Sequence, residues 1–383
     1  MTMLTRRGAL AALAASPCAA PAAPRPAAGE IVLGQSAPLS GPFAALGMHY
    51  RNGALLAFAE ANRAGGVHGR SLRLITLDDA YDAARAAANA HALLDEHGAI
   101  GFLNHMFTNT VRASWPIARE AGVCYLGPYT GHADLYRMRH PLLVLTRASF
   151  DDELARILDY VAIVGYHRVG LAYYDNAVGL ELKQEVQAGL QQRGGKALAV
   201  SAAMPIGGTQ AAAAAAKALN DGAPDAVLLG VSGTDAVALI QAQRSGGARP
   251  VYFARSLVGS RQLHAALGRE AQGIVVSQLV PSPARTGLPI VAEYRRLLQQ
   301  RQPNAEPDFV ELEGFVNAKV MLKTLERMGA SVGAPTRRAL ADAVSALGRI
   351  DLGGHVLDFS GGRRSGSRYV ELTMLRSDGT FAQ

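Results

Sequence analysis

Residues 30–47, EIVLGQSAPLSGPFAALG, contain the unit from which the chain is built. The first part, EIVLGQ, is a short apolar run typical of a buried strand. The following segment, SAPLSGPFAALG (36–47), has two prolines and two glycines but neither a helical period nor apolar alternation, which predicts a shaped loop. A helix is expected from about Met48 to Arg63. Ligands in open α/β sheets bind beside such strand ends, so this loop is a first candidate for a binding segment.

The same succession recurs along the chain and restarts at residue 150. Strands that alternate with helices predict βαβ units and parallel sheets buried on both faces, here as two α/β lobes in tandem. From residue 289 the pattern becomes mostly helical, and the last two strands are expected at 355–359 and 369–375. We interpret SGGRRSGS (360–367), between them, as a solvated hairpin loop rather than an anion site. The other expected strands are 72–77, 99–104, 123–127, 142–147, 168–173, 197–202, 225–230, 250–254 and 273–279.

The length of 383 residues favours two domains, and 49% hydrophobic with 18% charged residues is a globular composition. The sequence motifs of phosphate-binding loops, zinc sites and catalytic nucleophiles do not occur, and the histidines lack metal-ligand spacing. Asp78 and Asp79 end a strand, where adjacent side chains face opposite sides, so capping or a polar contact is expected there. We therefore expect no enzyme activity, no metal and no cofactor.

Residues 1–28 have the layout of an export signal, which we expect to be cleaved. Arg6 and Arg7 precede a short apolar run, Ala9–Ala15, and then small residues and prolines, similar to a twin-arginine signal. Removal of this segment, which also contains Arg25, lowers the formal charge from +7 to +4. A charge of that size does not indicate binding to nucleic acid or to acidic membranes.

The two cysteines, Cys18 and Cys124, allow few roles. Cys18 raises the alternative of a lipoprotein, which Pro17 directly before it disfavours. Once the signal is removed, Cys124 stands alone, so no internal disulfide is possible. Its apolar strand predicts a small core residue rather than a catalytic thiol.

Small, polar and aromatic residues follow several of the expected strands. The segments are NHMFTNT (104–110), GPYTG (127–131), YDNAVG (174–179) and GVSGT (230–234). Each is also an ordinary turn, but they fall at equivalent places in both lobes. Because ligands bind outside the carboxyl ends of parallel strands, these loops predict a binding cleft.

At this level of detail the chain resembles the leucine/isoleucine/valine-binding proteins of the periplasm, the substrate-binding components of ABC importers. The resemblance covers nearly all of the chain after residue 29. It is carried by segments that occur in the family's order: 31–47 with 53–94, PIAREAGVCYLGPYTG (116–131), RASFDDE (147–153), YYDNAVGLELKQEVQAGLQQRG (173–194) and FVELEGFVNAKVMLKTL (309–325).

The resemblance implies a type I periplasmic binding protein fold. Two doubly wound parallel-sheet lobes are joined by three hinge crossings, expected near 147–150, 277–281 and 352–356. Lobe one would then comprise residues 29–148 plus 279–353. Lobe two would comprise residues 149–278 plus 354–383.

The resemblance also implies how the first lobe holds a ligand carboxylate. In relatives that bind branched-chain amino acids, a hydroxyl and a backbone N–H from the loops after strands three and four do this. Thr108 stands at the hydroxyl position, and Tyr129 and Gly131 occupy the fourth-strand loop. Relatives often have threonine at Gly131, and Thr130 is the expected substitute.

The second lobe departs further from the family pattern. Val178 stands where relatives often have an aromatic residue, and Ser232 where a tyrosine is expected. The acid that pairs with the ligand's α-ammonium is replaced by Ser256, with Asp175 as an alternative partner. A buried ammonium without a counter-ion costs several kcal/mol, so the ammonium site is in question.

Two further pairs of positions complete the implied site. Leu46 and Phe309 are expected to supply apolar walls. Tyr81 and Phe107 stand where some relatives form a disulfide.

The implied function is extracytoplasmic capture of a small carboxylate-bearing ligand by hinge closure and its delivery to a membrane permease. A branched-chain or other hydrophobic amino acid is the family default, and a deaminated aromatic or aliphatic acid is the alternative. A bilobed ligand sensor is the competing class. We expect a monomer whose partners are the ligand and the permease subunits.

Overall fold

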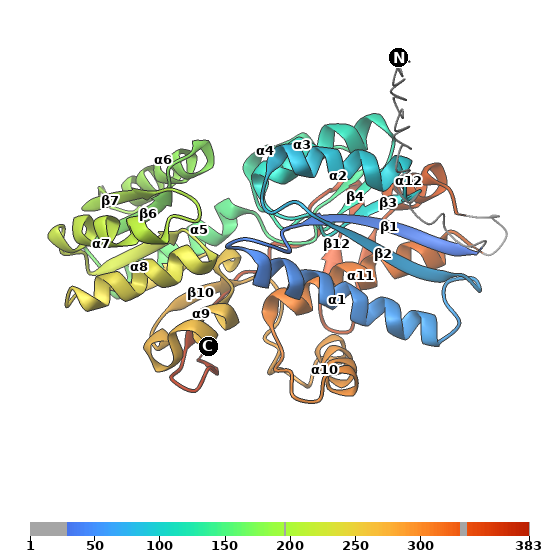
Figure 1. The fold of residues 1–383 in the computed structure, drawn as a ribbon. Helices are drawn as coiled ribbons and strands as arrows, with labels where there is room; N and C mark the ends of the chain where they lie inside the picture. Colours follow the sequence, from blue (N-terminus) through green and yellow to red (C-terminus); the bar gives the residue numbers. More distant parts are fainter. Residues whose placement is uncertain (1–28, 195–196, 330–334, 383) are drawn as a thin grey trace, which may run out of the picture.

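A computed structural model describes residues 29–194, 197–329 and 335–382. Its elements form two α/β lobes that lie side by side (Figure 1), which confirms the predicted fold class. The expected signal and Cys18 lie outside the described residues.

The first lobe is built on a five-stranded parallel sheet in the order β2–β1–β3–β4–β5. Its strands are β1 (Glu30–Ala37), β2 (Ser71–Asp78), β3 (Gly101–Leu103), β4 (Cys124–Leu126) and β5 (Leu143–Val144). Its helices are α1 (Ala44–Arg63), α2 (Ala83–Asp95), α3 (Thr108–Glu120), α4 (Ala133–Met138), α10 (Pro289–Arg301), α11 (Phe309–Arg327) and α12 (Arg337–Ser345).

The second lobe is built on a seven-stranded sheet in the order β14–β13–β10–β9–β8–β6–β7. Strand β13 runs antiparallel to both of its neighbours, β10 and β14. Its strands are β6 (Val169–Tyr174), β7 (Val200–Met204), β8 (Ala226–Gly230), β9 (Val251–Ala254), β10 (Val275–Gln278), β13 (Glu371–Leu375) and β14 (Phe381–Ala382). Its helices are α5 (Phe150–Val164), α6 (Ala177–Gln192), α7 (Ala212–Asp221), α8 (Gly233–Ser245) and α9 (Ser260–Leu267).

The chain passes between the sheets three times. It leaves the first lobe between β5 and α5, where Ser149 and Asp152 form a capping box that starts α5. It returns between β10 and α10, and leaves again before β13.

The third crossing differs from the expected position at 352–356. Those residues instead form the turn of a hairpin between β11 (Arg349–Asp351) and β12 (Val356–Asp358). Leu357 and Phe359 are buried in the first lobe's core, so this hairpin belongs to the first lobe. The crossing therefore follows residue 359.

The interpretation of residues 360–367 as a solvated hairpin loop is wrong. The strands on either side belong to different sheets, so they cannot pair with each other. The segment runs along β5: the Leu145 N–H donates to the carbonyl of Arg364 (2.7 Å), and the Gly366 N–H donates to that of Leu145 (2.8 Å).

The inner strands β3, β4, β6 and β10 are buried along their whole length, as expected where helices cover both faces of a parallel sheet. Cys124 is a fully buried core residue, as predicted, and burial raises the pKa of its thiol to about 12. Among the described residues, no helix combines the length and apolar character needed to cross a membrane. The described ranges also contain no group of three or more metal-ligating side chains arranged to hold an ion.

Candidate functional site

A cavity lies between the two lobes and takes its walls from both. It has about 540 Å³ of empty space, part of it open to solvent. The first lobe contributes the ends of β1, β2 and β3, and the second lobe contributes the start of α5 and the ends of β6, β8 and β9. The lining residues are Phe43, Tyr81, Phe107, Thr108, Phe150, Tyr174, Val178, Leu229, Gly230, Ser232, Arg255 and Leu257.

Two carboxylates position the first-lobe loops around this cavity. Asp78 accepts hydrogen bonds from the backbone N–H of Leu39 (2.8 Å) and from the Ser40 hydroxyl (2.6 Å), which fixes the loop that carries Phe43. Asp79 is buried and accepts from the backbone N–H of Tyr81 (2.8 Å). Burial raises the pKa of Asp79 to about 6. Of the two roles expected for this pair, capping or a polar hinge contact, the structure shows capping of backbone N–H groups within the first lobe.

The aromatic wall of the first lobe includes strained backbone. Tyr81 (φ 66°) and Phe107 (φ 63°) both lie in the left-handed region that non-glycine residues rarely occupy. Their ring centres are 5.2 Å apart, and the ring of Phe43 lies 4.7 Å from Tyr81 and 4.9 Å from Phe107. The two positions expected to match a disulfide of relatives are thus in contact, and they hold an aromatic pair instead.

Thr108 lies in the cavity wall as the first residue of α3. Its hydroxyl is 2.8 Å from that of Thr130, which is fully buried and also accepts the backbone N–H of His132 (3.3 Å). When Thr130 donates its single proton to Thr108, the Thr108 proton is free to point into the cavity. Thr130 therefore supports Thr108 and does not itself line the cavity.

Tyr129 and Gly131 lie behind the cavity rather than in its wall. The Tyr129 hydroxyl donates to the backbone carbonyl of Ser256 in the other lobe (3.0 Å). A Cβ on Gly131 would lie 2.5 Å from the backbone nitrogen of Phe150, so only glycine fits against the start of α5. Both residues join the lobes near the first crossing.

In the second lobe, Val178 and Ser232 line the cavity. Ser232 precedes α8, and its backbone N–H donates to the hydroxyl of Tyr174 (3.0 Å). Ser256 does not line the cavity. Its hydroxyl accepts from Arg147 and its N–H donates to Glu153 (2.8 Å).

Leu46 and Phe309 lie outside this cavity. Leu46 lines a wider groove between α1 and the helices α8 and α9, and Phe309 packs against Phe381 of the second lobe, with ring centres 5.0 Å apart. Both are apolar contacts between the lobes, not walls of the cavity. Asp175 is exposed and does not line the cavity either.

The sequence did not single out several lining residues, among them Phe150, Leu229 and Leu257, and the charged one that it missed is Arg255. It lies in the cavity wall, with its guanidinium carbon 4.1 Å from the centre of the Phe150 ring. Burial lowers the pKa of this guanidinium from its ordinary value, while Glu153 and Glu185 act in the opposite direction. The sequence contained an indication of this residue, because Arg255 is adjacent to Ser256, the position at which relatives have an acid and this chain does not.

Polar contacts also join the lobes beside the cavity. His132, which caps the start of α4, and Glu181 of α6 are 2.5 Å apart, and Arg112 is 3.5 Å from the same carboxylate. On the other side, the carbonyl of Pro42 lies so close to Gly233 that a Cβ there would be 2.4 Å away. The lobes are thus closed over the cavity in this structure.

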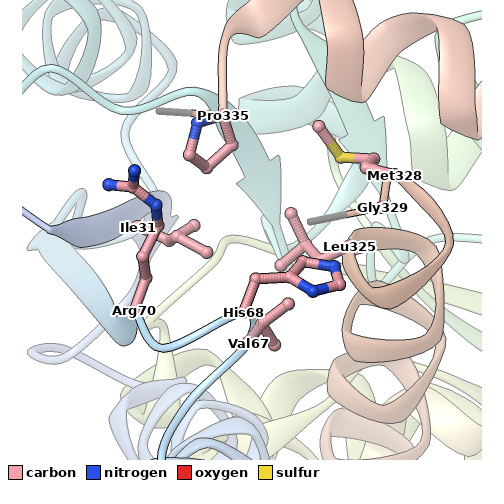
Figure 2. A pocket seen from close by; sticks show the side chains of 8 residues that line it. All are labelled: Ile31, Val67, His68, Arg70, Leu325, Met328, Gly329 and Pro335. Atoms are coloured by element: carbon pink, nitrogen blue, oxygen red, sulfur yellow. The ribbon is translucent and has the colours of Figure 1, made fainter. Parts of the chain in front are cut away.

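A second hollow, shown in Figure 2, lies at the far end of the first lobe. It holds about 290 Å³ and is formed by one lobe alone. The His68 ring lies 3.1 Å from the carbonyl of Glu326 at the end of α11. Because closure of the lobes does not change its walls, this hollow is not the candidate site. Its lining residues are Ile31, Val67, His68, Arg70, Leu325, Met328, Gly329 and Pro335.

Comparisons with known proteins match most of the chain. A family model described as "Periplasmic binding protein" matches residues 30–380. A solved structure, a possible leucine/isoleucine/valine-binding protein from Rhodopirellula baltica SH 1, is 28% identical with a TM-score of 0.84, over 95% of this chain and 98% of that one. Leu/Ile/Val-binding protein homolog 7 of Brucella abortus (strain 2308) is 24% identical over 362 residues, 89% of this chain and 88% of that protein. With an amino acid binding protein of Pseudomonas aeruginosa the chain shares 31% identity over 99 residues, which covers only 26% of that relative's length.

Proposed function

The chain belongs to the periplasmic binding protein family, and from this premise we infer that it captures a small carboxylate-bearing ligand between its lobes for an ABC importer. Members of this family bind their ligands without transforming them. The ligand is expected to have a hydrophobic body, because the cavity lining is mostly aromatic and aliphatic.

The observation that carries this proposal is the shared lining of the cavity. Thr108 and Phe107 come from the first lobe, and Phe150, Tyr174 and Ser232 come from the second. A ligand that touches both lobes binds the closed form better than the open form and shifts the equilibrium between them. The closed form would therefore distinguish the ligand-bound protein from the ligand-free protein when it meets the permease.

With the third crossing placed as the structure has it, we propose which residues move together as each lobe. The first comprises residues 29–148 with 279–366, because the segment up to Gly366 is hydrogen-bonded to Leu145 and Asp358, and the second comprises 149–278 with 371–382. The three connections between them act as the hinge, and the contacts of His132 with Glu181 form only when the lobes close.

The partners follow from the proposed role. The loaded, closed monomer docks on the permease subunits of the importer in the periplasm, after export directed by residues 1–28. Relatives described as Leu/Ile/Val-binding proteins support a branched-chain or other hydrophobic amino acid as the default ligand. A deaminated aromatic or aliphatic acid is the alternative.

Thermal unfolding against a ligand panel tests the proposal. The protein is unfolded and refolded to release bound molecules, then melted with hydrophobic amino acids and with the corresponding carboxylic acids. A ligand at 100 times its dissociation constant stabilises by about 2.7 kcal/mol, which is a clear shift in melting temperature. Thr108→Ala should reduce the shift. If no carboxylate of either kind moves the transition, the proposal is wrong.

A further inference from the structure

One ionised side chain in the cavity wall has no partner of opposite charge among the described residues. The guanidinium of Arg255 lies over the Phe150 ring. Within the part of the chain that the structure describes, it makes no hydrogen bond and no ion pair within 4.0 Å. The side chain is half-buried, so its nitrogens can still reach water or a ligand in the cavity. A guanidinium placed in a cavity wall without a hydrogen-bonded acid is open to pairing with an anion.

Resting on the proposed function, we propose that Arg255 binds the ligand's carboxylate and that the ligand is an aromatic carboxylate without an α-ammonium group. The planar guanidinium presents paired N–H donors that match the two oxygens of a carboxylate. Stacking on Phe150 fixes the plane of this fork before the ligand arrives.

Three acids act on Arg255 through their charge, Glu153, Glu185 and Asp151, but none forms an ion pair with it within 4.0 Å in the described chain. One oxygen of Glu153 accepts from the Ser256 N–H (2.8 Å) and from the Ser277 hydroxyl (2.5 Å). Its other oxygen is 3.8 Å from Arg147. Glu185 lies on α6, beyond ion-pair distance from Arg255. No carboxylate of the described chain occupies the hydrogen-bonding face of the guanidinium, so that face is available to an anion that enters the cavity.

A second donor faces the cavity from the opposite lobe. Thr108 has its hydroxyl held by Thr130 in an arrangement that leaves one proton for the ligand. Arg255 and Thr108 both line the cavity, so one carboxylate held between them would tie the lobes together. The anion would then be recognised only in the closed form.

An α-ammonium group has no comparable partner in the described cavity wall. Within the described chain, no Asp or Glu lines the cavity. Asp235 is the acid behind Tyr174 and does not line the cavity; its Oδ2 accepts from the Tyr174 hydroxyl (3.2 Å) and the Gly207 N–H (2.9 Å), while its Oδ1 is buried without a partner. A ligand ammonium would be buried beside the like charge of Arg255, which disfavours amino acids.

The body of the ligand is expected to be aromatic. Rings from both lobes surround the space, and offset or edge-to-face aromatic contacts add to simple apolar burial. The five rings are those of Phe43, Tyr81, Phe107, Phe150 and Tyr174.

Matched pairs of ligands test the inference by isothermal titration calorimetry on the refolded protein. The probes are 3-phenylpropanoate, L-phenylalanine, which adds only the ammonium, and 3-phenylpropanamide, which removes only the charge. We expect 3-phenylpropanoate to bind at least about 10-fold more tightly than either. A second pair, 4-methylpentanoate and L-leucine, should show the same preference with weaker binding overall.

Variants assign the effect to the residue. Arg255→Met should weaken 3-phenylpropanoate binding roughly 10- to 100-fold, and Arg255→Lys should weaken it less. The melting temperature of ligand-free Arg255→Met should not fall, because an unpaired charge is removed. Arg193→Gln is the matched control, since Arg193 pairs with Asp159 on the surface of the same lobe (2.7 Å).

The outcomes separate this inference from the proposed function. If phenylalanine or leucine binds as tightly as its deaminated partner, the inference is wrong and the proposed function stands. If carboxylates bind but Arg255→Met binds them like the unaltered protein, the assignment to Arg255 is wrong. If neither kind of ligand binds, the proposed function itself fails.

Discussion

Gly233→Ala should block closure of the lobes. Gly233 is the first residue of α8, and an added Cβ would lie 2.4 Å from the carbonyl oxygen of Pro42 in the other lobe. Side-chain Cβ atoms essentially never approach closer than 3.0 Å, so the lobes must separate locally by about 0.6 Å. Overpacking of this size costs about 1–3 kcal/mol, and only in the closed form.

The expected loss of affinity follows from that cost. In the proposed mechanism the ligand binds the closed form, so this cost predicts that the dissociation constant rises roughly 5- to 150-fold. Alanine at φ 59° also costs about 1–2 kcal/mol, but this strain is present in the open and closed forms alike. It lowers the melting temperature without changing affinity.

Gly247→Ala separates the two effects. Gly247 has φ 85°, and an added Cβ there would meet nothing within 4 Å, so it carries the backbone cost without the clash. We expect both variants to melt at lower temperature and only Gly233→Ala to lose affinity for 3-phenylpropanoate by calorimetry. Small-angle scattering should show that Gly233→Ala stays more extended with ligand. Equal affinity for the two variants would refute the reasoning.

Three further perturbations have distinct expected results. Burial and the neighbouring Asp308 raise the pKa of the Glu311 carboxyl from 4.5 to about 7. The folded state therefore holds this proton more tightly than the unfolded state, so stability falls as pH rises between about 4.5 and 7, by up to about 3 kcal/mol. Glu311→Gln should flatten that slope in urea unfolding at several pH values, and an unchanged slope would count against it. Glu181→Gln removes the charge of a carboxylate that contacts His132 across the lobes. Because Glu181 is partly exposed, affinity should fall at most about 5-fold, and the difference should shrink in high salt. Tyr129→Phe deletes a buried hydrogen bond between the lobes and should cost about 1 kcal/mol in ligand binding by calorimetry; a loss confined to melting temperature would contradict its role in closure.

Local sequence patterns predicted most of the architecture. The alternation of apolar strands with helices is a short-range property, and it located the sheets and the loops at their carboxyl ends. The family resemblance singled out Thr108, Val178 and Ser232 within those loops, and the structure brings all three to one cavity. The family resemblance is confirmed by the match over residues 30–380.

Features that depend on distant pairing were not predicted. Residues 360–367 lie between two strand-like segments, which locally favours a hairpin. The strand before the segment, β12, pairs with β11, and the strand after it, β13, pairs with β10. These pairings are set by the tertiary fold, so the segment runs along β5 and then leads into the crossing to the second lobe. Likewise, α1 begins at Ala44, not near Met48, because Asp78 shapes the preceding loop from a strand elsewhere in the sequence.

In the second lobe the sequence pointed to Ser256, but the residue in the cavity wall is its neighbour Arg255, and the reason is geometric. A 3₁₀ turn over Ser256–Val258 follows β9 directly. It turns Ser256 toward Arg147 and Glu153, while Arg255 lies in the cavity wall. An alignment by sequence position identifies the right loop but does not show which of two adjacent side chains faces the ligand.

Two arginines near the crossings, the buried Arg147 and the half-buried Arg255, differ in the acidic side chains that surround them. Arg147 is fully buried between Glu153 (3.8 Å) and Glu313 (3.6 Å), and its guanidinium lies 4.5 Å from the centre of the Tyr129 ring. This group therefore has one positive and two acidic side chains, and burial raises the pKa of Glu313, so Arg147 has counter-charges within the chain before any ligand binds. Arg255 is also stacked on an aromatic ring but has no such acids among the residues that the structure describes. The hinge region thus holds its own counter-charges, whereas the described cavity wall contains one guanidinium and no carboxylate, the arrangement from which we propose carboxylate binding. Selectivity for an anion follows from that difference, and it requires no acidic residue in the cavity wall.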